Sequence, residues 1–304
     1  MIKRPRVLIT GASGFIGKPI VNKLLMMGCE VLAIGREIPA QKKINSLHWL
    51  KANFSSPETY QAEINAFKPE VLIHLAWQDI PDYSLEKSIL NLNQSLSFIS
   101  FIAEIKSCKK ILIAGSCWEY GKMYGECLNT DTVNPNNFFA ISKYSLYLLS
   151  EVIAKQKFIK LGWFRLFFVY GPGQRSESLI PSILNNLKKG QLPNIRTPIN
   201  ANDFVYVDDV ADAFSKAVSA NFPSGIYNLG SGRSTTVLDV CRISEQILWG
   251  AESLTAQLES KTESSRCEVD FWADIKHSKE ILDWQPTISL KDGIQLTQQW
   301  INSQ

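Results

Sequence analysis

The sequence predicts a doubly wound α/β fold, a parallel sheet covered by helices on both faces, with a smaller C-terminal lobe. Four short, unbroken apolar runs lie in the first part of the chain, at 7–9, 31–34, 71–75 and 111–114, and a fifth spans 161–169. Helical patterns separate these runs. Continuous apolar strands that alternate with amphipathic helices are typical of a parallel sheet buried on both faces.

Composition narrows the function classes. Of the 304 residues 45% are hydrophobic and 20% are charged, and the formal net charge of +3 is spread along the chain. These values are ordinary for a globular protein, and without a block of like charges we expect no nucleic-acid partner. No apolar run approaches the roughly 18 residues that span a bilayer, and the N-terminus lacks the pattern of a signal peptide. We therefore expect a cytoplasmic protein with no membrane partner.

The six cysteines show no CxxC pair and no Cys/His spacing typical of zinc. This pattern favours reduced thiols in a reducing compartment, and we expect no metal site.

A glycine-rich turn directly follows the first predicted strand and opens a helix that runs to about residue 27. It reads Thr10-Gly11-Ala12-Ser13-Gly14-Phe15-Ile16-Gly17. Gly11 permits a tight turn, Gly14 lets the backbone approach a pyrophosphate, and Gly17 allows the helix to pack closely on the strand. Free N–H groups and the positive end of the helix dipole favour phosphate binding. The sequence therefore predicts a Rossmann unit that binds a dinucleotide.

The end of the second strand indicates which nicotinamide cofactor is bound. An NAD site has a carboxylate there for the ribose 2′-hydroxyl, whereas an NADP site has a cation for the 2′-phosphate. This strand ends in Ile34-Gly35-Arg36, and the first acid is Glu37. Because a guanidinium can stack on the adenine and pair with the phosphate, we expect NADP rather than NAD.

The sequence pattern changes after residue 172, from alternating strands and helices to short elements. Three prolines between 181 and 198 interrupt short elements, before an apolar run at 204–207 and a new helix. A chain of this length is compatible with two lobes that share a cleft. We expect residues 1–172 with 203–232 to form the NADP-binding Rossmann domain, and residues 173–202 with 233–304 to form the substrate-binding lobe.

Further motifs follow in a fixed order along the chain. They are His74-Leu75-Ala76 at a strand end, Asn91 at the start of a helix, Ser116 with Tyr120-Gly121, Ser142-Lys143, Tyr170-Gly171-Pro172-Gly173, and the stretches 205–210, 227–232 and 282–286. With the glycine-rich turn, they make nearly the whole chain resemble the extended short-chain dehydrogenases/reductases, the NAD-dependent epimerase/dehydratase family, that act on nucleotide sugars.

The resemblance implies the residues around each ligand. Around the cofactor they are Gly11, Ser13, Gly14, Phe15, Ile16, Gly17, Arg36, Asn53, Phe54, Leu75, Ala76, Trp77, Asn91, Lys143, Phe167 and Val169. Around a nucleotide-diphosphate sugar they are Trp77, Ser116, Cys117, Trp118, Phe139, Phe168, Arg175, Asn202 and Arg266. Many relatives have Asn at position 168 and Arg at position 202, so Arg266, followed by Arg175, is the expected phosphate partner. The resemblance also implies a homodimer built from helices near 91–106 and 140–156.

One position departs from the family pattern. The resemblance implies a Ser or Thr, a Tyr and a Lys as the catalytic group, and Ser116 and Lys143 match, but the residue four before Lys143 is Phe139. In such a group the tyrosine exchanges the proton, and its loss costs about a hundredfold to ten-thousandfold in rate. Three interpretations are open: an engineered substitution that traps a complex, a natural variant that uses water or another side chain, and a protein that binds without catalysis. We favour the first, because the neighbouring motifs are intact.

The resemblance also narrows the reaction. Sugar 4,6-dehydratases have Asp-Glu directly after the Ser or Thr, where this chain has Cys117-Trp118 with Glu119 one place late. Enzymes that epimerise and then reduce have a Cys where Trp118 stands and a His where Ser178 stands. A 4-epimerase and a 4-ketoreductase remain. Arg36 favours NADPH-dependent reduction of a nucleotide-linked 4-keto-6-deoxysugar, of the kind used in lipopolysaccharide O-antigen, and a non-catalytic NADP-binding protein is the other alternative.

Overall fold

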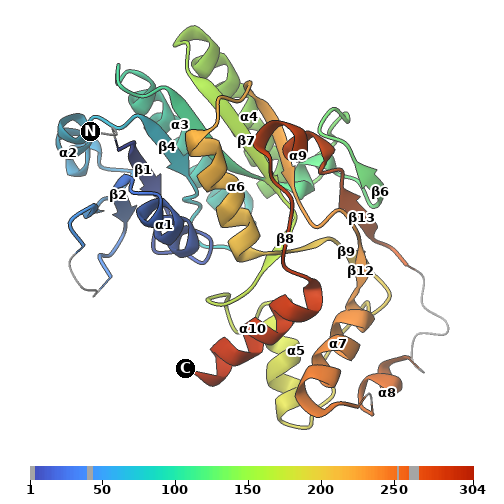
Figure 1. The fold of residues 1–304 in the computed structure, drawn as a ribbon. Coiled ribbons are helices and arrows are strands. Elements are labelled where there is room, and N and C mark those ends of the chain that lie inside the picture. The colour runs from blue at the N-terminus through green and yellow to red at the C-terminus, as the bar shows by residue number, and fades with distance from the viewer. Residues whose placement is uncertain (1–3, 40–43, 252, 260–266) are drawn as a thin grey trace.

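The computed structural model describes residues 4–39, 44–251, 253–259 and 267–304. Its centre is a seven-stranded sheet in which all pairs are parallel, in the order β11-β7-β5-β4-β1-β2-β3 (Figure 1). The strands are β1 (Arg6–Thr10), β2 (Glu30–Gly35), β3 (Leu47–Lys51), β4 (Val71–His74), β5 (Lys110–Ser116), β7 (Lys160–Leu166) and β11 (Gly225–Leu229). The predicted Rossmann fold is therefore confirmed. Because β1 lies between β2 and β4, the sheet has a switch point there, and such sheets bind ligands beside it at the carboxyl ends of the strands.

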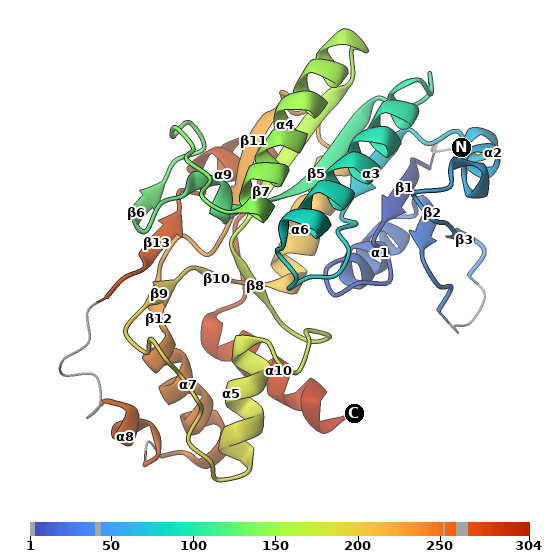
Figure 2. The same ribbon diagram turned by 180° about the vertical axis from the view of Figure 1, so that it is seen from behind.

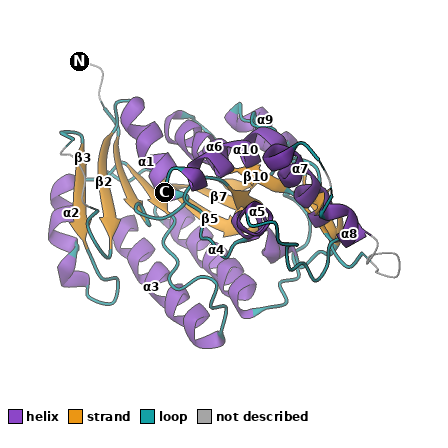
Figure 3. Ribbon diagram, turned by 90° about the horizontal axis from the view of Figure 1, so that it is seen from below, coloured by secondary structure: helices purple, strands orange, loops and turns teal. Residues whose placement is uncertain are grey.

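Helices cover both faces of the sheet (Figures 2 and 3). One face carries α1 (Gly17–Met26) and α6 (Val207–Ser219), and the other carries α3 (Leu85–Ala103) and α4 (Phe138–Gln156), with α2 (Gln61–Phe67) after the short turn η1 (Pro57–Thr59). Each interface is a separate apolar core, because the strands expose apolar side chains on both sides. Fully buried Phe164 in β7, for example, packs on Phe214 of α6, and burying one such ring contributes about 1.5–3 kcal/mol.

A smaller lobe hangs below the carboxyl ends of the strands in Figure 1. Strands β8 (Phe168–Tyr170) and β10 (Phe204–Tyr206) pair beside it, and its apolar core lies between helices α5, α7 and α10. These helices span α5 (Leu179–Lys188), α7 (Val237–Trp249) and α10 (Leu290–Asn302), with the short α8 (Thr255–Glu259) next to α7. A four-stranded sheet joins this lobe to the first, in the order β12 (Thr235–Thr236), β9 (Ala201–Asn202), β13 (Asp270–Ala273) and β6 (Tyr124–Cys127).

Part of the C-terminal tail returns to the first lobe. Helix α9 (Lys276–Leu282) packs against β11 and α6, and Trp284 is fully buried in the core beneath α1 and α6. The Trp284 indole donates a hydrogen bond to the Asp209 carbonyl oxygen at 2.8 Å. This stretch falls in the predicted range 233–304, so that range does not belong wholly to the smaller lobe.

The prediction that Asn91 begins a helix is wrong, because α3 begins six residues earlier, at Leu85. The Ser84 hydroxyl accepts a hydrogen bond from Lys87 N, and Asp82 accepts one from Ser84 N, so these two side chains cap the helix. Asn91 therefore lies inside α3. Among the described residues, none of the helices has the length and apolar character that crossing a bilayer requires.

Candidate active site at the carboxyl edge of the sheet

The predicted cofactor residues gather along one edge of the sheet. They follow the carboxyl ends of adjacent strands: the turn 11–17, which contains Ser13, after β1, Arg36 after β2, Asn53 and Phe54 after β3, Leu75, Ala76 and Trp77 after β4, and Phe167 and Val169 at the passage from β7 to β8. Segments far apart in sequence thus meet along one edge of the sheet, the position where open α/β sheets bind ligands.

The glycine-rich turn has the geometry of a phosphate cradle. Gly11 has a φ of 69°, and its carbonyl oxygen accepts a hydrogen bond from Gly14 N at 3.0 Å. A Cβ on Gly17 would lie 2.2 Å from that same oxygen, so only glycine fits there. Within the described ranges, the N–H groups of Phe15 and Ile16 have no hydrogen-bond partner. Free donors at the positive end of the α1 dipole fit a pyrophosphate.

Two side chains fix the chain where β4 ends. The Thr10 hydroxyl lies 2.9 Å from His74 Nδ1 and accepts hydrogen bonds from Leu75 N and Ala76 N, both at 3.2 Å. Burial, assisted by the Lys143 cation, lowers the pKa of His74 to about 3. The imidazole is therefore neutral, and it positions Leu75 and Ala76 beside the glycine-rich turn rather than acting as an acid.

Arg36 extends from the end of β2 toward the loop after β4. Its guanidinium is 3.7 Å from the Asp79 carboxylate, and its side chain is 73% exposed. Asn53 and Phe54 continue this edge after β3, where the Phe54 ring lies 4.6 Å from that of Phe98. An exposed cation at this place fits the 2′-phosphate of NADP, and the weak exposed pair with Asp79 does not prevent it from binding an anion.

The backbone of Ser116 is held by the Glu119 carboxylate, which forms a fully buried ion pair with Arg165. Ser116 ends β5 and caps the short helix η2 (Cys117–Tyr120), with its hydroxyl accepting a hydrogen bond from Trp118 N at 3.2 Å. The Glu119 carboxylate accepts hydrogen bonds from Ser116 N at 2.7 Å, from the Trp163 indole and from Arg165 Nε at 2.9 Å. Glu119 is 0% exposed. This clamp fixes the backbone that carries the Ser116 hydroxyl.

Lys143 lies on α4 and is buried. Its Nζ donates to the Ala114 carbonyl oxygen at 2.8 Å and stands 4.1 Å from the centre of the Trp77 ring. Burial lowers the pKa of Lys143 to about 8, and the nearby Glu119 carboxylate opposes that shift. The ammonium is therefore present at neutral pH, beside the end of β5 that also carries Ser116.

Three aromatic rings surround Phe139, the position of the missing tyrosine. Phe139 is 7% exposed, and its ring centre lies 5.5 Å from that of Trp77, 5.8 Å from that of Trp118 and 5.1 Å from that of Tyr83. Tyr83 and Trp118 also contact each other at 5.2 Å. We call Trp77, Tyr83, Trp118 and Phe139 the aromatic cluster. Each such pair contributes about 0.5–1.5 kcal/mol beyond its buried area, so the cluster holds Phe139 firmly in place.

The other predicted sugar-binding residues are spread over both lobes. Cys117 is 4% exposed and packs with Tyr120 and Cys127, so its thiol is turned into the protein. Phe168 in β8 packs on Phe204 and Phe271, and Asn202 lies in β9 opposite Phe271. Arg175 follows β8 and donates to the Ile80 carbonyl oxygen of the loop after β4. Arg266 lies outside the described residues.

The sequence did not single out three residues of this region. Glu119, Arg165 and Tyr83 each make the contacts described above. Ser116 and Glu119 have the Ser-x-x-Glu spacing of a capping box, which could have indicated the bond from Ser116 N to Glu119, whereas Tyr83 carries no such signal. A charged residue in a strand that is otherwise apolar, such as Arg165 between Phe164 and Leu166, is the one signal that predicts a buried partner.

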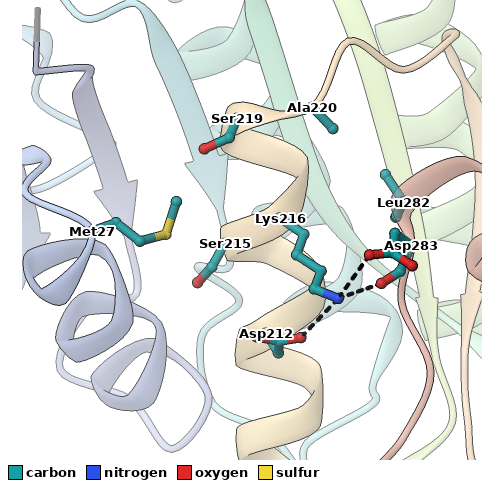
Figure 4. Close-up of a pocket in the computed structure, with 8 residues that line it drawn as sticks. All are labelled: Met27, Asp212, Ser215, Lys216, Ser219, Ala220, Leu282 and Asp283. Carbon is teal, nitrogen blue, oxygen red and sulfur yellow. Dashed lines mark hydrogen bonds and ion pairs between the residues drawn. The ribbon is translucent and has the colours of Figure 1, made fainter. Parts of the chain in front are cut away.

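A surface hollow of about 380 Å³ lies at the opposite edge of the sheet (Figure 4). It is lined by the ends of α1, α6 and α9, where Lys216 pairs with Asp212 and Asp283. Those helix ends lie next to the amino ends of the strands, away from the glycine-rich turn and Lys143. No group of three or more His, Cys, Asp or Glu side chains in the described part of the chain is arranged to hold a metal ion.

Comparison with known proteins identifies the family of the chain. A model of the NAD dependent epimerase/dehydratase family matches residues 7–230. The chain belongs to this family. Among curated members, it is 27% identical over 313 residues to a dTDP-4-dehydro-6-deoxyglucose reductase of Escherichia coli, with 95% of each chain covered. It is 29% identical over 316 residues to a putative UDP-glucose 4-epimerase of Methanocaldococcus jannaschii, with 98% of each covered.

Solved structures of nucleotide-sugar 4-epimerases share the fold. A UDP-glucose 4-epimerase from Thermotoga maritima with UDP-glucose superposes with a TM-score of 0.82 at 22% identity, covering 98% of this chain and 99% of the other. A UDP-glucuronic acid 4-epimerase from Bacillus cereus in complex with NAD gives a TM-score of 0.79 at 21% identity over the same shares.

Proposed function

We propose that the chain reduces a nucleotide-linked 4-keto-6-deoxysugar at C4 with NADPH. The observation that carries the proposal is the shared edge of the sheet: the turn 11–17 follows β1, Arg36 follows β2, and Ser116 ends β5. Lys143 reaches the same edge from α4, because its Nζ donates to the Ala114 carbonyl oxygen of β5. The similarity to the Escherichia coli dTDP-4-dehydro-6-deoxyglucose reductase supports a nucleotide sugar as substrate and reduction as the reaction.

The cofactor preference rests on Arg36. A bound nicotinamide cofactor supplies the hydride, and the turn 11–17 would hold its pyrophosphate. No carboxylate stands at the end of β2, and Arg36 is exposed there for a 2′-phosphate. Several solved relatives are complexes with NAD, so NADP would distinguish this chain from those neighbours.

Each catalytic residue has a distinct task in this proposal. The Ser116 hydroxyl binds the C4 oxygen of the ketone and stabilises the negative charge that develops on it. Lys143 keeps a cation close to that charge, with its Nζ fixed by the Ala114 carbonyl oxygen. Position 139 has no hydroxyl to deliver the proton, so catalysis is impaired unless another group supplies it.

A 4-epimerase is the second candidate. The similarity to the Methanocaldococcus jannaschii protein favours it as much as the reductase similarity favours reduction. An epimerase must take a proton from a hydroxyl as well as return one, and Phe139 removes the base that would do so. A non-catalytic NADP-binding protein of the same fold is the third candidate. Phe139 favours it, because this side chain has no hydroxyl to exchange a proton.

A homodimer is proposed through α3 and α4, which lie side by side on one face of the sheet (Figure 2). Both helices expose apolar side chains to solvent, namely Leu85, Ile89, Leu90, Ile141, Leu148, Leu149 and Val152. A second copy that covers these residues would remove them from water, which favours association.

The test is loss of NADPH in the presence of a panel of nucleotide-linked 4-keto-6-deoxysugars, with the parent chain and with Phe139→Tyr. Turnover of a ketone by either protein supports reduction. Interconversion of 4-hydroxy sugars without net loss of NADPH would instead support the epimerase. If neither protein turns over any sugar nucleotide, the proposed function is wrong and the non-catalytic alternative remains.

A further inference from the structure

The position that lacks a hydroxyl is in contact with another tyrosine. Tyr83 lies in the loop after β4, and its ring centre is 5.1 Å from that of Phe139 and 5.2 Å from that of Trp118. Trp118 directly follows Cys117 in η2, and its backbone N–H binds the Ser116 hydroxyl. The Tyr83 ring therefore contacts the Phe139 ring, and it contacts Trp118, which binds the Ser116 hydroxyl.

Three other tyrosines in this region either donate their hydroxyl to another side chain or pack outside the aromatic cluster. The Tyr120 hydroxyl is buried and donates to Asn228 Oδ1 at 2.7 Å. The Tyr147 hydroxyl donates to Glu151 at 2.9 Å, and Tyr144 stacks on Tyr147 rather than on the aromatic cluster. Among the described residues, the Tyr83 hydroxyl has no hydrogen-bond partner, so it is available to a ligand.

The loop that carries Tyr83 is tied down along its length. At its start, Gln78 N donates to Asn91 Oδ1 at 2.6 Å, and the Asn91 amide donates back to the Gln78 carbonyl oxygen at 3.2 Å. In its middle, Asp79 pairs with Lys87 at 2.8 Å. Arg175, from the segment after β8, donates to the carbonyl oxygen of Ile80. These ties hold Tyr83 against the cluster and give Asn91 a role in positioning the loop.

We infer that Tyr83 is the proton donor that replaces the tyrosine missing at position 139. The inference rests on the proposed reduction of a nucleotide-linked ketone. Hydride transfer to C4 forms the new C–H bond, and the electron pair of the carbonyl π bond moves onto oxygen. The Tyr83 O–H bond breaks, its proton goes to that oxygen, and the resulting phenolate recovers a proton from water. The products are an alcohol and the oxidised cofactor.

The surroundings of Tyr83 suit a donor better than a base. Burial raises the pKa of the Tyr83 phenol above its ordinary value, and the Arg175 cation opposes that shift. The phenol is therefore protonated at neutral pH, ready to give a proton to an alkoxide but not to take one from an alcohol. Phe139 is then a natural variant that relies on another side chain, which departs from the interpretation that the sequence alone favoured.

Five proteins test the inference: the parent chain, Phe139→Tyr, Tyr83→Phe, Tyr83→Phe with Phe139→Tyr, and Tyr144→Phe as the matched control on α4. Each is assayed for ketone reduction, and binding of NADPH and of the nucleotide sugar is measured separately by calorimetry. We expect Tyr83→Phe to lower kcat about a hundredfold to ten-thousandfold while NADPH affinity is unchanged. The double variant should recover most of the loss, and Tyr144→Phe should match the parent.

The outcomes separate this inference from the proposed function. A parent chain that reduces the ketone and a Tyr83→Phe variant of equal kcat would overturn the role of Tyr83 alone. An inactive parent that is activated by Phe139→Tyr would also overturn it, while the reductase function stands. Loss of NADPH binding in Tyr83→Phe would show a structural effect and contradict the inference. No turnover by the parent or by Phe139→Tyr overturns both proposals.

Discussion

Replacing Glu119 with glutamine removes the negative charge of the buried clamp under Ser116. The carboxylate now receives hydrogen bonds from Ser116 N, Trp163 Nε1 and Arg165 Nε, with both carboxylate oxygens in use. An amide of the same shape offers one accepting oxygen, and its NH2 group faces a donor. Arg165 is 1% exposed, so its cation would be left buried without a charged partner.

The expected loss of stability in Glu119→Gln follows from that geometry. Leaving one partner of a buried ion pair uncompensated costs about 3–5 kcal/mol, whereas an exposed pair contributes about 0–1 kcal/mol. For a chain of this length the entropy of unfolding converts the loss into a fall in Tm of roughly 5–8 °C. We expect this shift for Glu119→Gln, and a shift near zero for the control Glu151→Gln, whose carboxylate meets Tyr147 at the surface of α4.

The assay is thermal and urea unfolding of the three proteins at equal concentration, with the parent as reference. A Glu119→Gln variant that unfolds within about 1 kcal/mol of the parent would refute the reasoning, because the loss would then resemble that of an exposed pair.

Four further predictions concern the cofactor, the pH dependence of stability and the assembly. Arg36→Ala should weaken NADPH binding about tenfold in calorimetry and leave NADH binding unchanged, since one exposed charged hydrogen bond contributes about 1.5 kcal/mol; equal losses for both cofactors would contradict the 2′-phosphate role. Because the pKa of Lys143 is lowered to about 8, NADPH affinity should fall as pH rises through about 8, and Lys143→Arg should remove that fall. The same lowered pKa means that stability should rise between about pH 8 and the ordinary lysine pKa of 10.5, as the cost of burying the cation is relieved; a flat profile would argue against it. Val152→Lys places a charge on the exposed apolar face of α4 and should convert a dimer into a monomer in sedimentation, whereas a parent that already sediments as a monomer excludes the proposed interface.

Local patterns in the sequence predict the elements that depend on local physics. Strands β1, β2, β4, β5 and β7 contain the predicted apolar runs, because both of their faces are covered. The glycine-rich turn can also be predicted from the sequence, because the positive φ of Gly11 and the close approach at Gly17 disfavour other residues. Ser116 and Lys143 are implied by the family resemblance, through their spacing from Tyr120 and from position 139.

Features that depend on distant contacts were missed. Strand β3 mixes apolar and charged residues because it is an edge strand, so it lacks the run that marks its neighbours. Helix α3 begins after the Ser84 cap, so the Asn91 motif lies inside the helix and does not mark its start. The Glu119–Arg165 pair joins residues 46 apart, and Tyr83 meets Phe139 only in the folded protein. No spacing rule connects such pairs.

Calorimetric titration of the purified parent chain with NADPH and with NADH tests the central claim most directly, because every proposed step requires a nicotinamide cofactor on the turn 11–17. The account predicts saturable binding with one cofactor per chain, tighter for NADPH, and loss of binding in Gly17→Ala, whose Cβ would collide with the Gly11 carbonyl oxygen. Absence of binding for both cofactors would contradict it.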